Sequence, residues 1–404
     1  MVFEIDCRLG HQRITLYQMT SRAPYLNSRM QGFGTTIFAQ MSALAHRHNA
    51  INLGQGFPDV DGPIEIAEAA INAIRDGYNQ YPPGQGIAEL RTAIASHQAH
   101  YYDLNYDFET QVLVTAGATE AIAASLLAIC EVGDEVIVFE PFYDSYAAAI
   151  ALSGAKLVPV QLSKPNWEFD PEYLRRVVTP RTRALILNSP HNPTGKVFSY
   201  NELEQIAGLC VEYDLIAITD EVYEHLIFEG SHYPLANFEN MQDRCISISS
   251  AAKTFSFTGW KIGWITASTK LIEAVKTVKQ FLTYANGAPF QVAIAYALNE
   301  PARFCERIAP SLAESRNELS LGLEKLHFSA MKSDGTYFVT TDISDIYSGT
   351  ALEFCMELPE RVGVVAIPSS VFYQTPNQGE KLVRWTFCKR IDVITEALAR
   401  LSKL

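Results

Sequence analysis

The stretch ALILNSPHNPTG, residues 184–195, decides the fold, because its apolar run ends abruptly in a turn rich in proline, asparagine and glycine. Similar short apolar runs occur at residues 112–115, 136–139, 215–219 and 245–249. Helix-like segments such as residues 119–130 and 201–213 lie between several of these runs. Buried strands that alternate with helices are typical of a mostly parallel sheet covered on both faces. The sequence therefore predicts one large α/β unit over residues 55–295.

The rest of the chain has a different pattern of predicted helices and strands. After a helical segment at residues 270–285, longer helices are mixed with short strands, which is typical of an α+β domain. The predicted helices lie at residues 303–326 and 391–402, and the predicted strands at residues 336–341, 364–367 and 382–387. We expect a smaller α+β domain made of residues 296–404 together with residues 31–54. Residues 1–30 show no clear periodicity, so we expect an N-terminal extension and assign it no role.

The composition is that of a globular protein with an acidic surface. A chain of 404 residues is longer than one ordinary core requires, which agrees with two packed units. The 45 acidic and 32 basic residues give a formal net charge of −13. This charge has the wrong sign for general attraction to nucleic acid or to an anionic membrane, so we expect neither as a partner.

The cysteines and the N-terminus both favour a cytoplasmic protein. The seven cysteines are an odd number, are widely scattered and include no C-x-x-C pair. This pattern favours reduced thiols in a cytosol and argues against structural zinc, so we expect no metal site. The first thirty residues contain Glu4, Asp6 and Arg8, so they lack the apolar run of a signal peptide, and no long apolar segment follows later.

The best-known nucleotide, zinc-protease and hydrolase motifs are absent. The sequence has no G-x-G-x-x-G, no G-x-x-x-x-G-K-S/T, no H-E-x-x-H and no G-x-S-x-G. In sheets of the predicted kind, ligands bind beyond the carboxyl ends of the strands. The residues that follow each predicted strand are therefore the candidates for a functional site.

Four predicted strands end in polar or small residues that suit a single cofactor. They are followed by the turn AGATE (residues 116–120), by Asn192, by Asp220 and Tyr223, and by Ser250 and Lys253. Each has an ordinary structural explanation on its own, the first as a tight turn before a helix. Together they match pyridoxal 5′-phosphate, which needs a lysine for a Schiff base, a carboxylate for its ring nitrogen, donors for its phenolic oxygen and backbone N–H groups for its phosphate.

From about residue 30 to residue 404 the chain resembles the fold-type I, class I aminotransferases, which depend on pyridoxal phosphate. The motifs that carry the resemblance are NPTG (192–195), DEVY (220–223), SAAK (250–253), GWK (259–261) and VRW (383–385). The segments GTTIFAQMSALA (34–45) and GQGFPD (54–59) are similar to the branch of methionine aminotransferases and kynurenine-glutamine transaminases.

The resemblance implies roles for the cofactor-binding residues. Lys253 would form the Schiff base and move the substrate proton, and Asp220 would pair with the ring nitrogen. Asn192 and Tyr223 would donate to the phenolic oxygen, and Tyr143 would stack on the ring unless it belongs to the core. The phosphate would be held by Ala118, Thr119, Ser250 and Lys261. Lys261 stands where many members carry arginine, so a compact ammonium group replaces the planar guanidinium group.

The resemblance also implies the substrate contacts and a homodimer. Arg384 would bind the substrate α-carboxylate, with Asn192 and the backbone of Gly56 beside it. Phe38 would lie near the substrate side chain, although a core position is an equal alternative. Tyr81 matches a tyrosine that reaches the phosphate of the neighbouring subunit, and the alternative is a surface aromatic residue.

The expected reaction is a ping-pong transamination from a neutral or aromatic amino acid, such as methionine, glutamine or possibly kynurenine, to a 2-oxo acid. Aspartate is a poorer expected donor, because no arginine or lysine occurs between Lys279 and Arg303 to pair with a side-chain carboxylate. A β-lyase acting on cysteine conjugates or cystathionine remains the alternative within the same cofactor chemistry. Ser250 and Lys253 also fit the S-x-x-K of serine acyl-transferases, but the S-D-N and K-T-G of those enzymes are absent.

Overall fold

The computed structural model describes residues 4–9, 12–17 and 24–404, which divide into two compact units, Met1–Gly34 and Thr35–Leu404. In the first unit, strands β1 (Glu4–Leu9) and β2 (Gln12–Tyr17) pair antiparallel, and a short 3-10 helix covers Ser28–Met30. The sequence analysis assigned no element to residues 1–30, so these two strands were not predicted. Their signal was the alternation of Ile5, Cys7 and Leu9 with polar residues, a strand period that is weak over so few positions.

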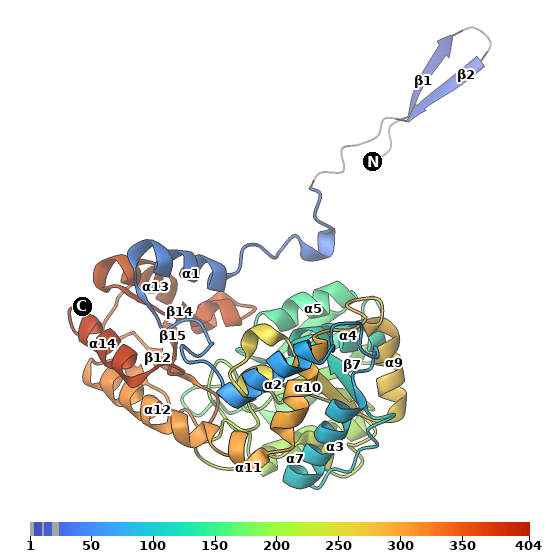
Figure 1. The fold of residues 1–404 in the computed structure, drawn as a ribbon. Coiled ribbons are helices and arrows are strands. Elements are labelled where there is room, and N and C mark those ends of the chain that lie inside the picture. Colours follow the sequence, from blue (N-terminus) through green and yellow to red (C-terminus); the bar gives the residue numbers. More distant parts are fainter. Residues whose placement is uncertain (1–3, 10–11, 18–23) are drawn as a thin grey trace. The chain divides into compact units, whose positions relative to one another are not determined.

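The second unit is built around a seven-stranded sheet (Figure 1). Its strands follow the order β4 (Val112–Thr115), β10 (Gly263–Ala267), β9 (Cys245–Ser250), β8 (Ile216–Asp220), β7 (Thr182–Asn188), β5 (Glu135–Glu140) and β6 (Lys156–Gln161). Strand β10 is antiparallel to both of its neighbours, and the other neighbouring pairs are parallel. The predicted mostly parallel α/β sheet is thus confirmed.

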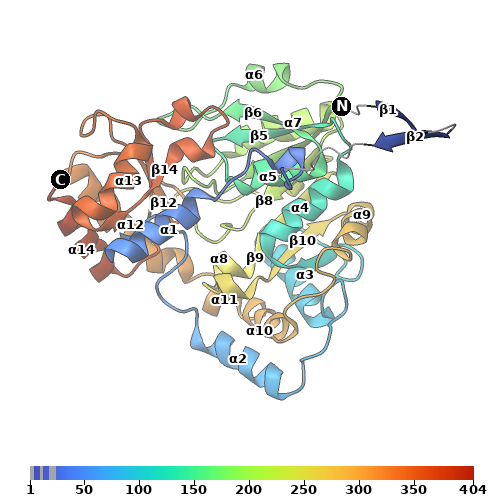
Figure 2. The same ribbon diagram turned by 90° about the horizontal axis from the view of Figure 1, so that it is seen from above.

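Helices cover both faces of this sheet, as the alternation of buried side chains along one strand shows. Ile137 and Phe139 of β5 belong to one hydrophobic core, whereas Val136 and Val138 belong to another. The first core is completed by α2 (Ile64–Arg75), α3 (Ala88–Tyr102), α7 (Tyr200–Glu212) and α10 (Ala288–Leu298). The second is completed by α4 (Gly117–Ile129), α5 (Ser145–Ser153) and α9 (Thr269–Lys279). The sheet is consequently buried on both sides, as Figure 2 shows from above.

A third hydrophobic core gathers the C-terminal segments around a small antiparallel sheet. This sheet has the order β11 (Ser329–Ala330), β12 (Phe338–Asp342), β15 (Leu382–Thr386) and β14 (Ile367–Pro368). Strands β3 (Ile51–Asn52) and β13 (Val364–Val365) form a separate parallel pair. The packed helices are α1 (Ile37–His48), α12 (Ile308–Lys325), α13 (Ala351–Val362) and α14 (Ile391–Leu401). Residues 35–404 form one compact unit, so the domain boundaries remain a prediction.

One predicted helix is shorter than expected. The helix predicted for residues 270–285 ends at Lys279, whose buried ammonium donates to the backbone oxygens of Gly84 (2.7 Å) and Tyr284 (2.6 Å). These bonds hold the following residues in a turn, and Gly287 then takes a left-handed conformation at φ 52° before α10 begins. The remaining short helices are α6 (Pro171–Arg176), α8 (Ala251–Thr254) and α11 (Pro301–Phe304).

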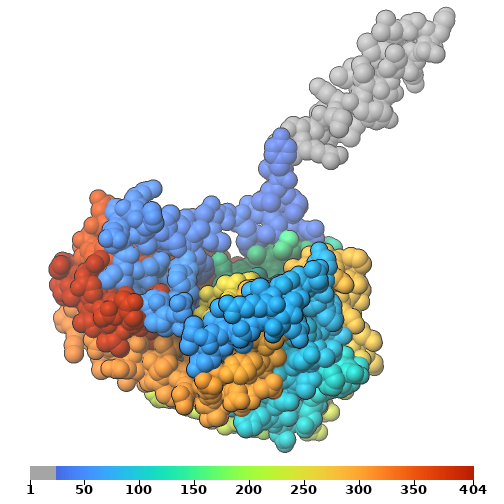
Figure 3. Space-filling view, viewed as in Figure 1, coloured from blue at the N-terminus to red at the C-terminus, as the bar shows by residue number. Residues whose placement is uncertain are grey.

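The helices and the cysteines of the described residues have two further properties. Within the described residues, every helix is too short or too polar to cross a lipid bilayer. The cysteines at positions 130, 210, 245, 305, 355 and 388 are free thiols, and all but Cys130 are buried. Figure 3 shows the solvent-facing surface of the same fold.

Candidate functional site

The predicted site residues follow the carboxyl ends of neighbouring strands of the central sheet. Asp220 is the last residue of β8, and Ser250 is the last residue of β9. Lys253 lies in the short helix α8 that follows β9 directly, and Asn192 lies in the turn after β7. Parallel strands that end at one edge of a sheet bring such residues together.

Lys253 is held by a phenol and a carbonyl. Its ammonium donates to the hydroxyl oxygen of Tyr337 (2.7 Å) and to the backbone oxygen of Gly56 (3.3 Å). The Tyr337 hydroxyl in turn donates to the same Gly56 oxygen (2.5 Å). Burial lowers the pKa of Lys253 to about 8, and the nearby charge of Arg384 acts in the same direction. The amine can therefore lose its proton close to neutral pH, as a nucleophile or general base requires.

Asp220 is a buried carboxylate with its own donors. Its Oδ2 accepts from the hydroxyl of Tyr146 (2.6 Å), and its Oδ1 accepts from the backbone N–H of Val222 (3.4 Å). Burial raises the pKa of Asp220 to about 6, although both hydrogen bonds oppose the shift. The carboxylate is mostly ionised at neutral pH and can attract a protonated ring nitrogen.

Arg384 is a buried cation on strand β15. Its guanidinium donates to Asn192 Oδ1 (2.9 Å) and to the backbone oxygen of Gly54 (2.8 Å), while the buried Nε has no hydrogen-bond partner. Three phenylalanine rings surround it, with the guanidinium carbon 4.0 Å from the ring centre of Phe338, 4.9 Å from that of Phe372 and 5.3 Å from that of Phe38.

The charge of Arg384 forms no direct ion pair among the described residues, although the carboxylate of Asp144 is close enough to act on it. None of the ion pairs among the described residues involves Arg384. Burial lowers its pKa to about 10, so it still carries a positive charge at neutral pH. A buried cation without a carboxylate is suited to receive one from a ligand.

Two predicted donors lie next to these charged groups. The ring of Tyr223 is perpendicular to that of Tyr337, with centroids 5.2 Å apart, and burial raises the pKa of Tyr223 so that its phenol stays protonated. Asn192 turns its oxygen to Arg384, which leaves its amide N–H groups to donate elsewhere. Tyr143 is half-buried, and its ring lies edge-on to Tyr146 at 5.8 Å.

The predicted phosphate-binding residues surround the start of α4. Gly117 has a left-handed φ of 74°, and a Cβ added there would lie 3.2 Å from the Nζ of Lys261. The Lys261 ammonium is thus beside the first turn of the helix, where backbone N–H groups and the helix dipole favour an anion. Ala118 is half-buried and Thr119 is exposed in this turn, and Ser250 is buried at the end of β9.

Gly56 is closely packed, whereas Tyr81 is exposed to solvent. A Cβ on Gly56 would lie 2.6 Å from the ring of Phe338, so only glycine allows this backbone to approach so closely. Tyr81 is 85% exposed, and its ring meets Tyr284 edge-on at 5.9 Å. Tyr81, Thr119 and Lys261 are the predicted site residues that are exposed in the single chain.

The structure adds residues that the sequence analysis missed. Tyr337 contacts the Lys253 amine, Tyr146 contacts Asp220, and Phe338 and Phe372 enclose Arg384. Tyr337 and Phe338 lie at the start of a correctly predicted strand region, but nothing in the local pattern indicates that one of them reaches Lys253. Tyr146 lies in the first turn of α5, three residues after Tyr143, which precedes this helix.

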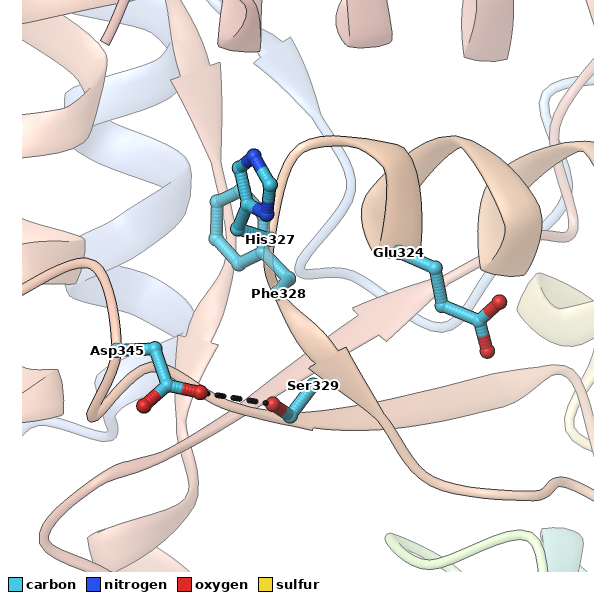
Figure 4. Close-up of a pocket in the computed structure, with 5 residues that line it drawn as sticks. All are labelled: Glu324, His327, Phe328, Ser329 and Asp345. Carbon is cyan, nitrogen blue, oxygen red and sulfur yellow. Dashed lines mark hydrogen bonds between the residues drawn. The ribbon is translucent and has the colours of Figure 1, made fainter.

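A separate surface hollow contains none of these residues. It is lined by Glu324, His327, Phe328, Ser329 and Asp345 (Figure 4). A weak hydrogen bond of 3.4 Å joins Ser329 to Asp345 across it. We assign it no part in the chemistry.

The residues present fit pyridoxal phosphate. The site offers an amine with a lowered pKa, a buried carboxylate and a protonated phenol, which are the groups that the aldehyde, the ring nitrogen and the phenolic oxygen require. The start of α4 with Lys261 beside it suits a phosphate. The unpaired Nε of Arg384 leaves one donor for a substrate carboxylate.

Comparisons with known proteins agree with this geometry. The family model for class I and II aminotransferases matches residues 48–401. The chain is 51% identical to a probable N-succinyldiaminopimelate aminotransferase of Mycobacterium tuberculosis over 93% of this chain and 98% of the relative. A solved structure of the M. tuberculosis enzyme has a TM-score of 0.91, with 93% of this chain and 99% of that chain covered.

Two more distant relatives carry other substrate names. The chain is 37% identical to a methionine aminotransferase of Escherichia coli, over 96% of this chain and 100% of the relative. It is 35% identical to human kynurenine–oxoglutarate transaminase 3, over 91% of this chain and 88% of the relative.

The lowered pKa of Lys253 predicts how its reactivity depends on pH. Only the neutral amine reacts with an acylating reagent, so in the cofactor-free protein labelling of Lys253 should rise as the pH passes through about 8. A lysine in an unstructured reference peptide should respond about two pH units higher. Mass spectrometry of the labelled peptides measures both. Equal pH midpoints for the two lysines would show that Lys253 is not desolvated.

Proposed function

Because the chain belongs to the class I and II aminotransferase family, we propose that it transfers the amino group of a neutral or aromatic amino acid to a 2-oxo acid by a ping-pong mechanism. The protein is an aminotransferase and depends on pyridoxal phosphate, as its family does. The substrate class is our proposal. The observation that carries it is the buried guanidinium of Arg384, which forms no ion pair with a carboxylate among the described residues.

Each proposed role follows from the surroundings of the residue. Bound pyridoxal phosphate supplies a protonated ring that withdraws electrons from the substrate α-carbon. Asp220 keeps the ring nitrogen protonated, because a buried carboxylate gains most from a cation nearby. Lys253 carries the proton to and from the α-carbon, since its pKa of about 8 makes both protonation states accessible. Arg384 binds and orients the α-carboxylate.

The preference for donors follows from the charges near the site. Arg384 serves the α-carboxylate that all amino acids share, and residues 280–302 contain no arginine or lysine for a second carboxylate. The short side chain of aspartate would place a charge among aromatic rings such as Phe38 and Phe372. Loss of hydration without a cation costs several kcal/mol. Methionine, glutamine and aromatic donors avoid this cost.

N-succinyldiaminopimelate is a second candidate donor. The relative with 51% identity over nearly its full length is named for this substrate. Its amide group is neutral, and its additional carboxylates lie far along the chain from the reacting carbon. The lack of an arginine or lysine in residues 280–302 for a second carboxylate therefore disfavours this compound less than aspartate.

A panel of donors tests the proposal. We expect kcat/KM for methionine, glutamine, phenylalanine, kynurenine or N-succinyldiaminopimelate to exceed that for aspartate by roughly tenfold or more, about 1.4 kcal/mol in transition-state binding. Arg384→Ala should lower kcat/KM for every donor by a similar factor, because the α-carboxylate is common to them.

The same panel separates the alternatives. N-succinyldiaminopimelate as the best donor would identify the second candidate, and aspartate as the best donor would contradict the proposal. Keto acid formed from a cysteine conjugate without a 2-oxo acid acceptor would reveal β-lyase activity. Transamination requires the acceptor for continued turnover.

We also propose that the active unit is a homodimer with shared sites. Tyr81 and Phe281 are 85% and 83% exposed, and the neighbouring Leu282 and Tyr284 are about half exposed. Aromatic residues rarely remain so exposed on a monomer unless they form an interface. An interface here would place Tyr81 within reach of a second subunit, as its resemblance to the family tyrosine implies.

Charging this surface should break the dimer. Phe281→Glu should shift the protein towards a monomer in sedimentation equilibrium, because a carboxylate resists burial in an apolar interface. Leu352→Glu provides the control, since Leu352 is an exposed apolar residue on α13. Tyr81→Phe should weaken cofactor retention without changing the assembly. A wild-type monomer with full activity would refute the shared site.

We propose the cytoplasm as the compartment of the protein. The free, mostly buried thiols of the described cysteines suit a reducing environment. This proposal rests on the thiol chemistry alone.

A further inference from the structure

A cluster of two histidines and a cysteine lies outside the site described above. His97 on α3, His225 in the segment after β8 and Cys305 at the end of α11 place their ligand atoms within 4.8 Å of one another. The Nε2 atoms of the two histidines are 2.7 Å apart. His97 and Cys305 are 3% and 1% exposed, and His225 is half-buried. The proposed transamination uses none of these three side chains.

Both histidines are neutral at physiological pH. Burial lowers the pKa of His97 to about 3 and that of His225 to about 4. Neutral imidazole is the form that binds a metal ion. Because the two Nε2 atoms face each other, one must carry a hydrogen when no cation lies between them.

A buried carboxylate without a cation lies beside the cluster. Glu224 is 4% exposed, and its Oε2 is buried without a hydrogen-bond partner, while Oε1 accepts from the hydroxyl of Ser249. Burial chiefly raises the pKa of the Cys305 thiol, and the charge of Glu224 adds to this rise. The same charge acts on His225, so the carboxylate is close to both. None of the ion pairs among the described residues includes Glu224. A buried charge of this kind is costly unless a cation offsets it.

The neighbour of His97 offers a partner for its other ring nitrogen. The amide of Gln98 lies 3.4 Å from His97 Nδ1, and its buried Oε1 has no hydrogen-bond partner. A half-turn of this amide would let Oε1 accept from an Nδ1–H group, which frees Nε2 to bind a metal. Metal-binding histidines are commonly fixed in this way by a second hydrogen bond.

We propose that His97, His225 and Cys305 bind a zinc ion, with the buried carboxylate of Glu224 as a nearby negative charge. The proposal is independent of the substrate assigned above. It departs from the expectation drawn from the cysteine spacing, because these ligands come from three distant parts of the chain and form no C-x-x-C pair.

The chemistry of the donor set favours zinc. Two imidazoles and one thiolate are ligands that zinc accepts in tetrahedral sites, whereas magnesium and calcium prefer oxygen. Binding would release the proton of the Cys305 thiol to water and form the zinc–sulfur bond. The thiolate and the Glu224 carboxylate then balance the two positive charges of the ion. Tetrahedral zinc keeps two nitrogen ligands about 3.3 Å apart, so the two rings must separate slightly.

The position of the cluster suggests what the ion would do. It would join α3 and α11 to the segment that also carries Asp220 and Tyr223. A metal that binds only the folded protein stabilises it by mass action. The ion would therefore act as a structural link behind the cofactor-binding residues.

Zinc binding to the intact holoenzyme tests the proposal. We expect wild-type protein incubated with ZnCl2 and dialysed against metal-free buffer to retain about one zinc ion per chain, as measured by mass spectrometry of the metal. Cys305→Ser and His225→Gln should lose most of this zinc. Cys355→Ser is the matched control, because Cys355 is an equally buried thiol in a different core, and it should retain the zinc.

A second measurement needs no variant of the proposed ligands. CoCl2 added to wild-type holoenzyme should produce visible absorption bands of tetrahedral cobalt at longer wavelengths than the cofactor absorbs, and zinc should remove them. Zinc should also raise the melting temperature of wild type and of Cys355→Ser. Absence of zinc retention and of cobalt bands in wild type, or retention unchanged in Cys305→Ser and His225→Gln, would overturn the proposal.

Discussion

The removal of Lys253, Asp220 and Arg384 from water is the constraint on which the rest of the structure depends. Burial lowers the pKa of Lys253 to about 8 and raises that of Asp220 to about 6, so both pKa values lie close to neutral pH. Desolvating such charges costs several kcal/mol per group. Hydrogen bonds from Tyr146 to Asp220, and from Arg384 to Asn192 and Gly54, offset part of this cost. The fold must therefore hold these partners at fixed distances.

The two sheets contribute different parts of this arrangement. The central sheet supplies Asp220, Lys253 and the start of α4, all at or just after the carboxyl ends of its strands. The small sheet supplies Arg384 from β15 and Tyr337 from the residue before β12. The third hydrophobic core also includes Tyr223, which follows β8 of the central sheet. Contacts between the two sheets therefore determine the distance between the proton-carrying amine and the carboxylate-binding arginine.

Sequence patterns predicted the elements with strong local signals. The strand at residues 112–115 and the strand predicted at 245–249 lie where expected, because continuous apolar runs bounded by turns are specific to buried strands. Strand β10 was missed, because its sequence GWITA (Gly263–Ala267) mixes glycine and threonine with apolar residues and forms no continuous apolar run. The helix predicted for residues 270–285 ended early because of the hydrogen bonds of Lys279, which reach as far as Gly84 and have no local signal.

The candidate functional site could also be predicted only in part from the sequence. Asn192, Asp220 and Lys253 were identifiable because each follows a predicted strand, but Tyr337 and Tyr146 reach the site only through tertiary packing. The His97–His225–Cys305 cluster has no sequence signature for the same reason.

Borohydride reduction of the holoenzyme, followed by peptide mapping, tests the central claim most directly. The desolvated amine of Lys253 is the group that we expect to carry the cofactor, so the reduced pyridoxyl group should be found on the peptide that contains Lys253. Lys253→Ala should remain folded and show no such adduct. Recovery of the pyridoxyl group on Lys261, Lys279 or any other lysine would contradict the account.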